Sequence, residues 1–170
     1  MNLVRPQTPY QFMPPKYSRA FRPFLHALAR YSLKNQFKVT GIQISGHETL
    51  NQLVQEKQSV MVAPNHADHA DPALMITVGR RCKFAFHFMA AREGFENSRL
   101  ERWILQRGGA FSINREGADL ASIKMAMKIL QAGEFPLVVF PEGEIYHHME
   151  TLDELNEGVA SIALRAVTNL

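Results

Sequence analysis

Short apolar runs alternate along this chain with longer stretches in which apolar residues recur at helical spacing. The short runs predict strands at 39–46, 59–63, 84–90, 110–113 and 136–140. The longer stretches predict helices at 18–37, 50–56, 72–78, 100–106, 119–131 and 159–167. Strands and helices that alternate in this way favour an α/β fold, in which helices flank a central, mostly parallel sheet.

Three clusters of polar residues follow directly after predicted strands. They cover residues 65–71, 114–116 and 142–144. In open α/β sheets, functional side chains gather at the carboxyl ends of the strands. The sequence therefore predicts one active site to which all three clusters contribute.

The first cluster contains a histidine and an aspartate five residues apart, His66 and Asp71. A neutral imidazole can take a proton from a hydroxyl that attacks a carbonyl, and a carboxylate that accepts its other N–H fixes the tautomer. Residues five apart do not share one face of a regular helix, so a turn must bring the pair together, and Pro72 favours a helix start at this point. We therefore expect His66 to act as a general base that Asp71 orients.

Two other interpretations fit the same residues. In the first, Asp71 only caps a helix and His66 only satisfies backbone groups. In the second, a metal-dependent hydrolase uses the potential ligands His66, Asp68, His69 and Asp71. The sequence contains no GxGxxG, P-loop or CxxC pattern, so it gives no support for a nucleotide site or a structural zinc site.

Basic residues are concentrated near the N-terminus. Residues 1–47 contain seven Lys or Arg and no Asp or Glu, although the net charge of the whole chain is only +3. The helix predicted at 18–37 has an apolar stripe with basic residues around it: Phe21, Phe24, Leu25 and Leu28, with Arg19, Arg22, Arg30 and Lys34. Such an amphipathic helix can lie on an anionic membrane, and the alternative is a helix that packs on its own domain with a solvated basic face. No aromatic–basic interleaving of a nucleic-acid module is present, so we expect no nucleic acid partner.

Three motifs together resemble those of the glycerolipid acyltransferases, the superfamily that contains 1-acylglycerol-3-phosphate acyltransferase. Asn65-His66-(four residues)-Asp71 is similar to the N-H-x4-D motif, the segment 109–115 to the second motif, and the segment 140–143 (Phe-Pro-Glu-Gly) to the third motif. Their order and spacing also match the family. The resemblance implies an acyltransferase domain over residues 39–170, preceded by a basic arm and amphipathic helix over residues 1–38.

The resemblance implies transfer of a fatty acyl group from acyl-CoA or acyl-carrier protein to a hydroxyl of a lysophospholipid or glycerol-phosphate-like acceptor. His66 and Asp71 would be the catalytic pair, and Arg115 would bind the phosphate of the acceptor. The substrate-binding set as a whole would be Asn65, Asn114, Arg115, Glu142 and Gly143. A thioester donor is already activated, so we expect no cofactor and no metal. A non-catalytic lipid-binding relative would keep the same fold.

The chain departs from the family pattern at three places. Ser112 stands where the second motif usually has an aromatic residue or proline, and Glu144 follows the third motif where the family continues Thr-Arg-Ser. Loss of that arginine disfavours phosphate binding, because charge-assisted contacts are the strong ones. The family's fourth motif, an apolar strand with Val-Pro, does not occur before Leu170, so we expect the sequence to be part of a longer protein.

The sequence also bears on location. The N-terminus lacks the apolar region of a signal peptide, and no uncharged run reaches the ~18–20 apolar residues needed to span a bilayer. The single cysteine, Cys82, fits a reducing compartment. We therefore expect a cytoplasmic protein that attaches peripherally to the cytoplasmic face of a membrane.

Overall fold

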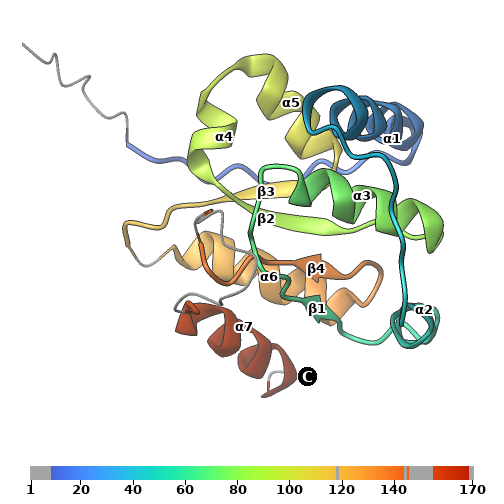
Figure 1. Ribbon diagram of the computed structural model, residues 1–170. Coiled ribbons are helices and arrows are strands. Elements are labelled where there is room, and N and C mark those ends of the chain that lie inside the picture. The colour runs from blue at the N-terminus through green and yellow to red at the C-terminus, as the bar shows by residue number, and fades with distance from the viewer. Residues whose placement is uncertain (1–8, 118, 144, 146–154, 169–170) are drawn as a thin grey trace, which may run out of the picture.

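The computed structural model describes residues 9–117, 119–143, 145 and 155–168. In these residues, four strands form one parallel sheet: β1 (Met61–Val62), β2 (His87–Ala91), β3 (Ala110–Ile113) and β4 (Leu137–Val138). Their spatial order is β1-β4-β2-β3, and helices lie on both sides of the sheet (Figure 1). The predicted α/β fold with a parallel sheet is confirmed.

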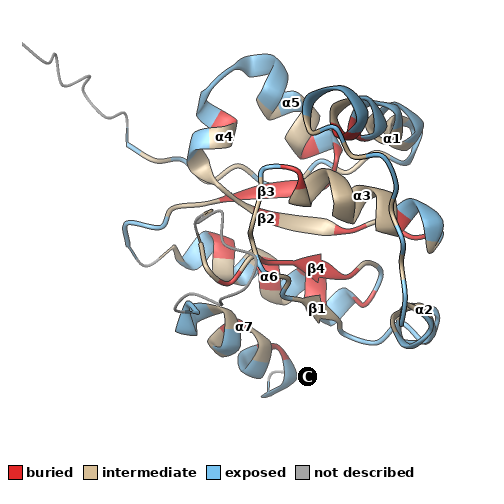
Figure 2. Ribbon diagram, viewed as in Figure 1, coloured by how far each residue is buried: buried red, intermediate tan, exposed pale blue. Residues whose placement is uncertain are grey.

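One face of the sheet packs against the helices α6 (Leu120–Ala132) and α7 (Glu157–Thr168). The core cluster on this face includes Phe111, Leu137 and Val139, and the strand residues in it are among the most deeply buried of the chain (Figure 2). The residues on either side of Val138 thus point to the same face, as the alternation of side chains in a strand requires.

The opposite face of the sheet packs against α2 (Glu48–Gln55) and α3 (Asp71–Arg81). Val138 points to this face and forms a second core cluster with Phe84 and Phe86. Because both faces are covered, the strand run at 136–140 is apolar throughout instead of alternating with polar residues.

Helix α6 illustrates how local sequence sets an element's ends. Ala126 and Leu130 recur at helical spacing and are buried. Asp119 caps the N-terminus, because its carboxylate accepts a hydrogen bond of 3.0 Å from the backbone N–H of Ser122. The helix ends at Gly133, whose φ of +60° is a left-handed conformation that glycine adopts without steric strain.

The helix predicted at 18–37 is confirmed, in three consecutive parts. They are a 3₁₀ turn (Arg19–Phe21), α1 (Arg22–Tyr31) and a π-helical turn (Ser32–Gln36). Helix α1 packs on α3. The predicted apolar stripe divides between two environments, because Leu25 is half-buried whereas Phe24 and Leu28 are exposed. No helix in the described part of the chain is long and apolar enough to cross a membrane.

The segment before this helix lies along β3, which is an edge strand of the sheet. The backbone N–H of Ser112 donates to the Met13 carbonyl at 3.1 Å, and the Met13 N–H donates to the Ser112 hydroxyl at 2.9 Å. Two further hydrogen bonds join this segment to the end of helix α5 (Arg99–Arg107). The Lys16 N–H donates to the Gln106 carbonyl, and the Gln106 side chain donates to the Pro14 carbonyl. The segment therefore covers backbone groups that an uncovered edge strand would expose.

One predicted element is absent, and one observed element was not predicted. Residues 39–46, all of which are described, form no strand, because no strand of the sheet lies beside them to accept their hydrogen bonds. The chain enters this segment through Lys38 at a φ of +57°, and the Val39 N–H donates back to Leu33. In addition, a short helix that was not predicted, α4 (Arg92–Glu96), follows β2 directly.

Candidate active site

His66 and Asp71 meet in the turn that leads from β1 into α3. The His66 Nδ1 atom lies 3.0 Å from Asp71 Oδ2. The turn is closed by Asp68, whose backbone N–H donates to the same Asp71 oxygen at 2.9 Å and whose carboxylate accepts from the Ala70 N–H at 2.7 Å. The predicted turn at the start of α3 thus brings the two side chains together, and both are largely buried, with 15% and 18% of their surface exposed.

The loop after β4 holds His66 from its other side. The imidazole stacks on the ring of Phe140 with 4.0 Å between ring centroids and 19° between planes. The backbone N–H of His66 donates to Glu142 Oε1 at 3.1 Å. Glu142, which the sequence assigned to substrate binding, therefore contacts the backbone of the histidine loop.

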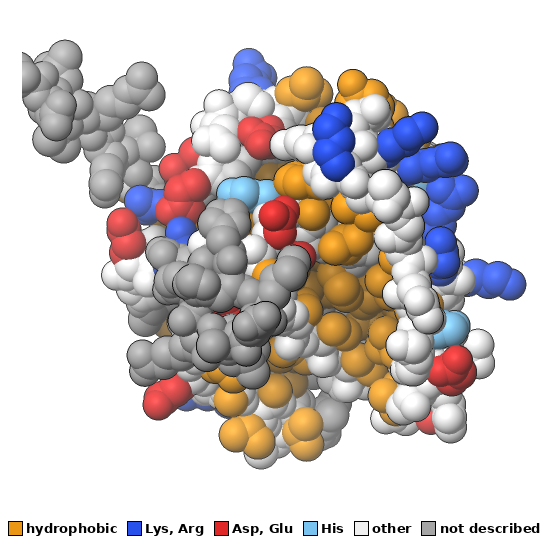
Figure 3. All heavy atoms as spheres, in the orientation of Figure 1, with side chains coloured by type: hydrophobic (Ala, Val, Ile, Leu, Met, Phe, Trp, Pro, Cys, Tyr) orange, Lys and Arg blue, Asp and Glu red, His pale blue; other side chains and the backbone are white. Residues whose placement is uncertain are grey.

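A cavity of about 410 Å³ opens beside His66. Its lining is mainly apolar and comes from α1, α3 and α5 as well as from the strands, and includes Leu25, Pro72, Ile76, Phe88, Ile104 and Leu105. Figure 3 shows hydrophobic side chains around a hollow in the middle of one face of the molecule. A long hydrocarbon chain would lose contact with water in such a cavity, which favours its binding.

Polar residues line the cavity at the carboxyl ends of β3 and β4. Asn114, Arg115 and Gly143 belong to this rim. The backbone N–H of Asn114 donates to Asp119 at 3.0 Å, and a φ of +74° at Gly143 turns the chain there. Asn65 is exposed next to His66, and the cavity lining found among the described residues does not include it. Glu144 lies outside the described residues.

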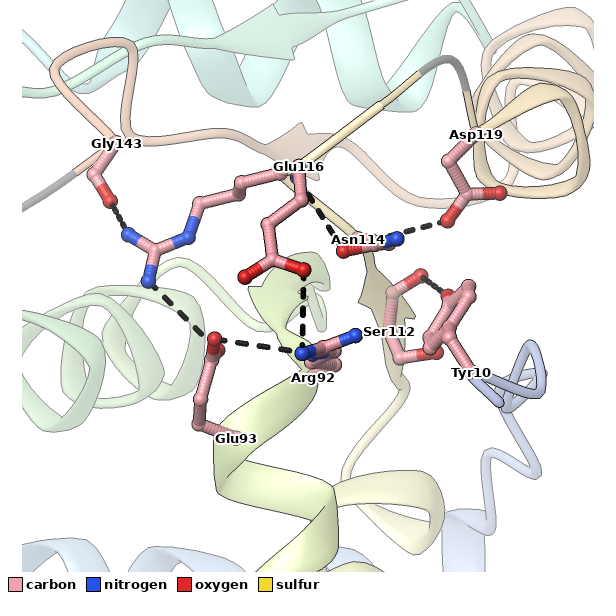
Figure 4. A network of polar contacts seen from close by, with 9 residues as sticks. Tyr10, Arg92, Glu93, Ser112, Asn114, Glu116, Asp119 and Gly143 are labelled. Carbon is pink, nitrogen blue, oxygen red and sulfur yellow. Dashed lines mark hydrogen bonds and ion pairs between the residues drawn. The ribbon is translucent and has the colours of Figure 1, made fainter. Parts of the chain in front are cut away.

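Two arginines and two glutamates form a network at this rim (Figure 4). Arg115 donates to the carbonyl oxygen of Gly143 and lies 3.7 Å from Glu93. Arg92 lies 3.4 Å from Glu116 and 4.0 Å from Glu93, and only 12% of its side chain is exposed. The carboxylates thus offset the charge of both cations.

Sequence reasoning missed Arg92 and Glu93. Both directly follow β2, so they obey the same rule that predicted the other three clusters. The strand predicted at 84–90 ends two residues before Arg92, the same separation as for the clusters at 65–71 and 142–144, so the rule could have found these two residues.

The sequence of this chain matches a known protein family. The sequence model of the family described as Acyltransferase matches residues 41–169, which is well over half of the chain. The chain belongs to the acyltransferase family. A relative, 1-acyl-sn-glycerol-3-phosphate acyltransferase of Streptococcus pneumoniae (strain ATCC BAA-255 / R6), is 31% identical over 112 residues. That alignment covers 66% of this chain and 39% of the relative, so the chain spans less than half of the length of that protein.

Ser112, which stands where the second motif of the family usually has an aromatic residue or proline, has a structural role. Its side chain is fully buried and points away from the cavity toward the N-terminal segment, where its hydroxyl lies 2.8 Å from the hydroxyl of Tyr10. The Ser112 carbonyl accepts from the Ser122 hydroxyl at 2.6 Å. Ser112 therefore joins the second motif to α6 and to the segment that covers β3.

Asp119 belongs to the same hydrogen-bond network as Ser112 and Ser122. Burial alone would raise the pKa of Asp119, but hydrogen bonds from the Ser122 hydroxyl and from the backbone of Asn114 and Ser122 outweigh burial and hold the pKa below its ordinary value. Burial raises the pKa of Tyr10, which contacts the network from the N-terminal segment. The ionised carboxylate of Asp119 thus fixes the turn that carries Arg115.

The residues proposed for a metal-dependent hydrolase do not form a metal site. Among the described residues, no group of three or more His, Cys, Asp or Glu side chains is arranged to hold a metal ion. His66 and Asp71 contact each other, while the Asp68 carboxylate accepts from the backbone of its own turn. This arrangement gives no support to the interpretation that the chain is a metal-dependent hydrolase.

Proposed function

We propose that this chain transfers a fatty acyl group from a thioester to a hydroxyl of a lysophospholipid-like acceptor, with His66 as the general base. The observation that supports this most directly is the His66–Asp71 hydrogen bond beside a mainly apolar cavity. Family membership and the name of the streptococcal relative support the same reaction class. The donor is proposed to be acyl-CoA or acyl-carrier protein.

The proposed reaction needs only groups of the chain and the two substrates. The acceptor hydroxyl attacks the thioester carbonyl carbon while Nε2 of His66 takes its proton. Asp71 stabilises the imidazolium through Nδ1. The C–S bond then breaks, and the imidazolium returns its proton to the departing sulfur. The step as proposed involves no metal and no cofactor.

We propose that the phosphate of the acceptor binds to Arg115 at the polar rim of the cavity, with Arg92, which does not line the cavity, in the same ion-pair network. Asn114 and Gly143 line the cavity at the same rim, which supports a role in substrate binding. Glu116 is ion-paired with Arg92, and Glu93 with Arg115. An entering phosphate therefore has to displace these carboxylates. Asn65, also expected to bind substrate, receives no such support because it is exposed beside the cavity.

A lipid acceptor requires access to a membrane, and we propose that the basic helix α1 supplies the contact. Arg30 and Lys34 are exposed on this part of the chain. Basic residues near a membrane surface are attracted to anionic headgroups at about 1 kcal/mol each. Peripheral attachment of this kind, on the cytoplasmic face, is part of the proposal.

An acyl-transfer assay tests the function. Purified protein is incubated with labelled oleoyl-CoA, or the corresponding carrier-protein thioester, and one acceptor at a time: 1-acylglycerol 3-phosphate, lysophosphatidylcholine or monoacylglycerol. We expect transfer to the first acceptor, and we expect His66→Ala to lower kcat by about 10²–10⁴-fold. His47→Ala, which removes a histidine that does not line the cavity, serves as the matched control. No transfer with any donor and acceptor would refute the proposal.

A further inference from the structure

Helices α1 and α5 expose large hydrophobic side chains on their outer faces. On α1 these are Phe24, Leu28 and Tyr31, the last of them 67% exposed. On α5 they are Leu100 and Trp103, which are 66% and 46% exposed. We call these five residues the outer patch.

The outer patch is continuous across the two helices. The ring of Phe21, at the end of the 3₁₀ turn before α1, lies 5.0 Å from the ring of Phe24 and 4.9 Å from the ring of Trp103. Phe21 thus joins the aromatic side chains of α1 and α5. Exposed hydrophobic patches of this kind mark interaction sites.

Basic side chains surround the outer patch. On α5, Arg99 and Arg107 are exposed four residues before and after Trp103, so all three lie on one helical face. Beside α1, two grooves share His26, Arg30, Lys34 and Arg80, and their lining in the described residues contains no Asp or Glu. Figure 3 shows Lys and Arg side chains gathered at the edge of the molecule where α1 lies, next to hydrophobic ones over α1 and α5.

We propose that α1 and α5 together form a docking surface for an anionic lipid bilayer, with Trp103 and Leu100 inserted at the headgroup level. Aromatic and leucine side chains flanked by arginines match an interface that is apolar below and anionic above. A soluble polyanion would be bound by the basic grooves alone and would leave the outer patch in water. The proposal adds α5 to the basic helix as a second contact and assigns its apolar residues the inserting role.

The same two helices border the cavity. Leu25 of α1 and the pair Ile104 and Leu105 of α5 line it from the inner faces. Docking by the outer faces therefore holds the cavity next to the bilayer that contains a lipid acceptor. In this respect the inference rests on the proposed function, but docking itself involves no acyl transfer and is measured without a donor.

The fluorescence of Trp103 tests the inference in the unmodified protein, because Trp103 is the one tryptophan of the sequence. The probe is vesicles of equal parts phosphatidylcholine and phosphatidylglycerol. We expect the emission of Trp103 to shift to the blue and to be quenched when the acyl chains are brominated, with a much weaker effect in pure phosphatidylcholine. Co-sedimentation with the vesicles without any change in Trp103 emission would overturn the role of α5.

Two double variants distinguish insertion of α5 from nonspecific binding of vesicles by exposed hydrophobic residues. We expect Leu100→Ser with Trp103→Ser to weaken co-sedimentation by about tenfold or more. Leu164→Ser with Val167→Ser removes two apolar residues of α7 that are at least about as exposed, at 69% and 65%, and should leave binding unchanged. Equal losses in both pairs, no loss in either, or shielding of Trp103 by self-association without vesicles would each refute the inference. So would shielding of Trp103 by an acidic carrier protein when vesicles have no effect.

Discussion

One oxygen of Asp71 accepts two hydrogen bonds, from the His66 ring and from the backbone of Asp68. The carboxylate is therefore fixed by the turn before it orients the histidine. In Asp71→Asn, the side chain keeps its size but is neutral, so it no longer stabilises the imidazolium, and an NH₂ group in the place of Oδ2 could only donate. We expect kcat to fall by up to about 10⁴-fold, because the tautomer and orientation of His66 are lost. Thermal unfolding of the variant, measured in parallel, should change far less than its activity does.

Glu142 offers a second test at the same scale, since its contact is with the backbone of His66. We expect Glu142→Ala to lower kcat by roughly 10²-fold, because a displacement of the histidine by about 1 Å has that effect. The KM for the acceptor should stay nearly constant. Glu142→Gln keeps an oxygen that can accept the same N–H and should recover most of kcat. A raised KM with unchanged kcat in both variants would instead assign Glu142 to acceptor binding.

At the scale of elements, the C-terminus of α6 depends on the absence of a side chain at Gly133. A Cβ atom there would lie 2.2 Å from the Lys57 carbonyl oxygen, in the turn between α2 and β1, and φ is +60°. We expect Gly133→Ala to lower the free energy of unfolding by about 1–3 kcal/mol. Gly41→Ala, where no atom lies within 4 Å of the added Cβ, is the control and should be close to neutral in denaturant titrations.

Asp119, at the N-terminus of α6, makes a pH-dependent contribution to the free energy of unfolding. Its pKa in the folded protein lies below the unfolded value of about 4, so the ionised carboxylate stabilises the fold at neutral pH. This contribution is lost as the pH falls from the unfolded pKa through the folded pKa. Asp119→Ala should lower the free energy of unfolding by about 0.5–2 kcal/mol at pH 7, and the difference should shrink below about pH 4. Ser98→Ala removes the uncharged cap of α5, whose deficit should not depend on pH.

At the scale of the whole molecule, the segment over residues 10–18 links the N-terminus to the far edge of the sheet. Removal of residues 1–18 would expose the backbone of β3 and leave several hydrogen-bonding groups of Ser112 and Gln106 without partners. At about 1 kcal/mol for each hydrogen bond, we expect a loss of about 3 kcal/mol or more in the free energy of unfolding. Light scattering should detect aggregation through the uncovered edge. Removal of residues 1–8 alone leaves these contacts in place and serves as the comparison.

How much of the fold follows from the sequence can be argued from particular elements. The strand at 110–113 and the helix at 119–131 were predicted within one residue, because the first is a short apolar run and the second has clear helical periodicity with a glycine at its end. The run at 39–46 has a strand pattern but no neighbour to pair with, and a pattern carries no information about neighbours. For the same reason the sequence could not predict that β4 lies between β1 and β2.

The candidate site follows from the sequence to a similar extent. The rule about strand ends gathered His66, Arg115 and Gly143 around one cavity, as expected. The contact of Glu142 with the His66 backbone could not be predicted, because residue patterns mark bonds to a nearby main-chain N–H, as at helix caps, and these two residues are 76 apart in the chain. Ser112 was read as an altered site residue, whereas its hydroxyl is bonded to an arm nearly a hundred residues earlier in the chain.

The position of β4 also governs when the site can exist during synthesis. β1 pairs with β4 alone, and β4 is the last strand of the described sheet to leave the ribosome. Until residue 138 emerges, the loop with His66 has no sheet to hold it, and Phe140 and Glu142 are not yet there to support the ring. A nascent chain that stalls before this point therefore carries the histidine but not the assembled site.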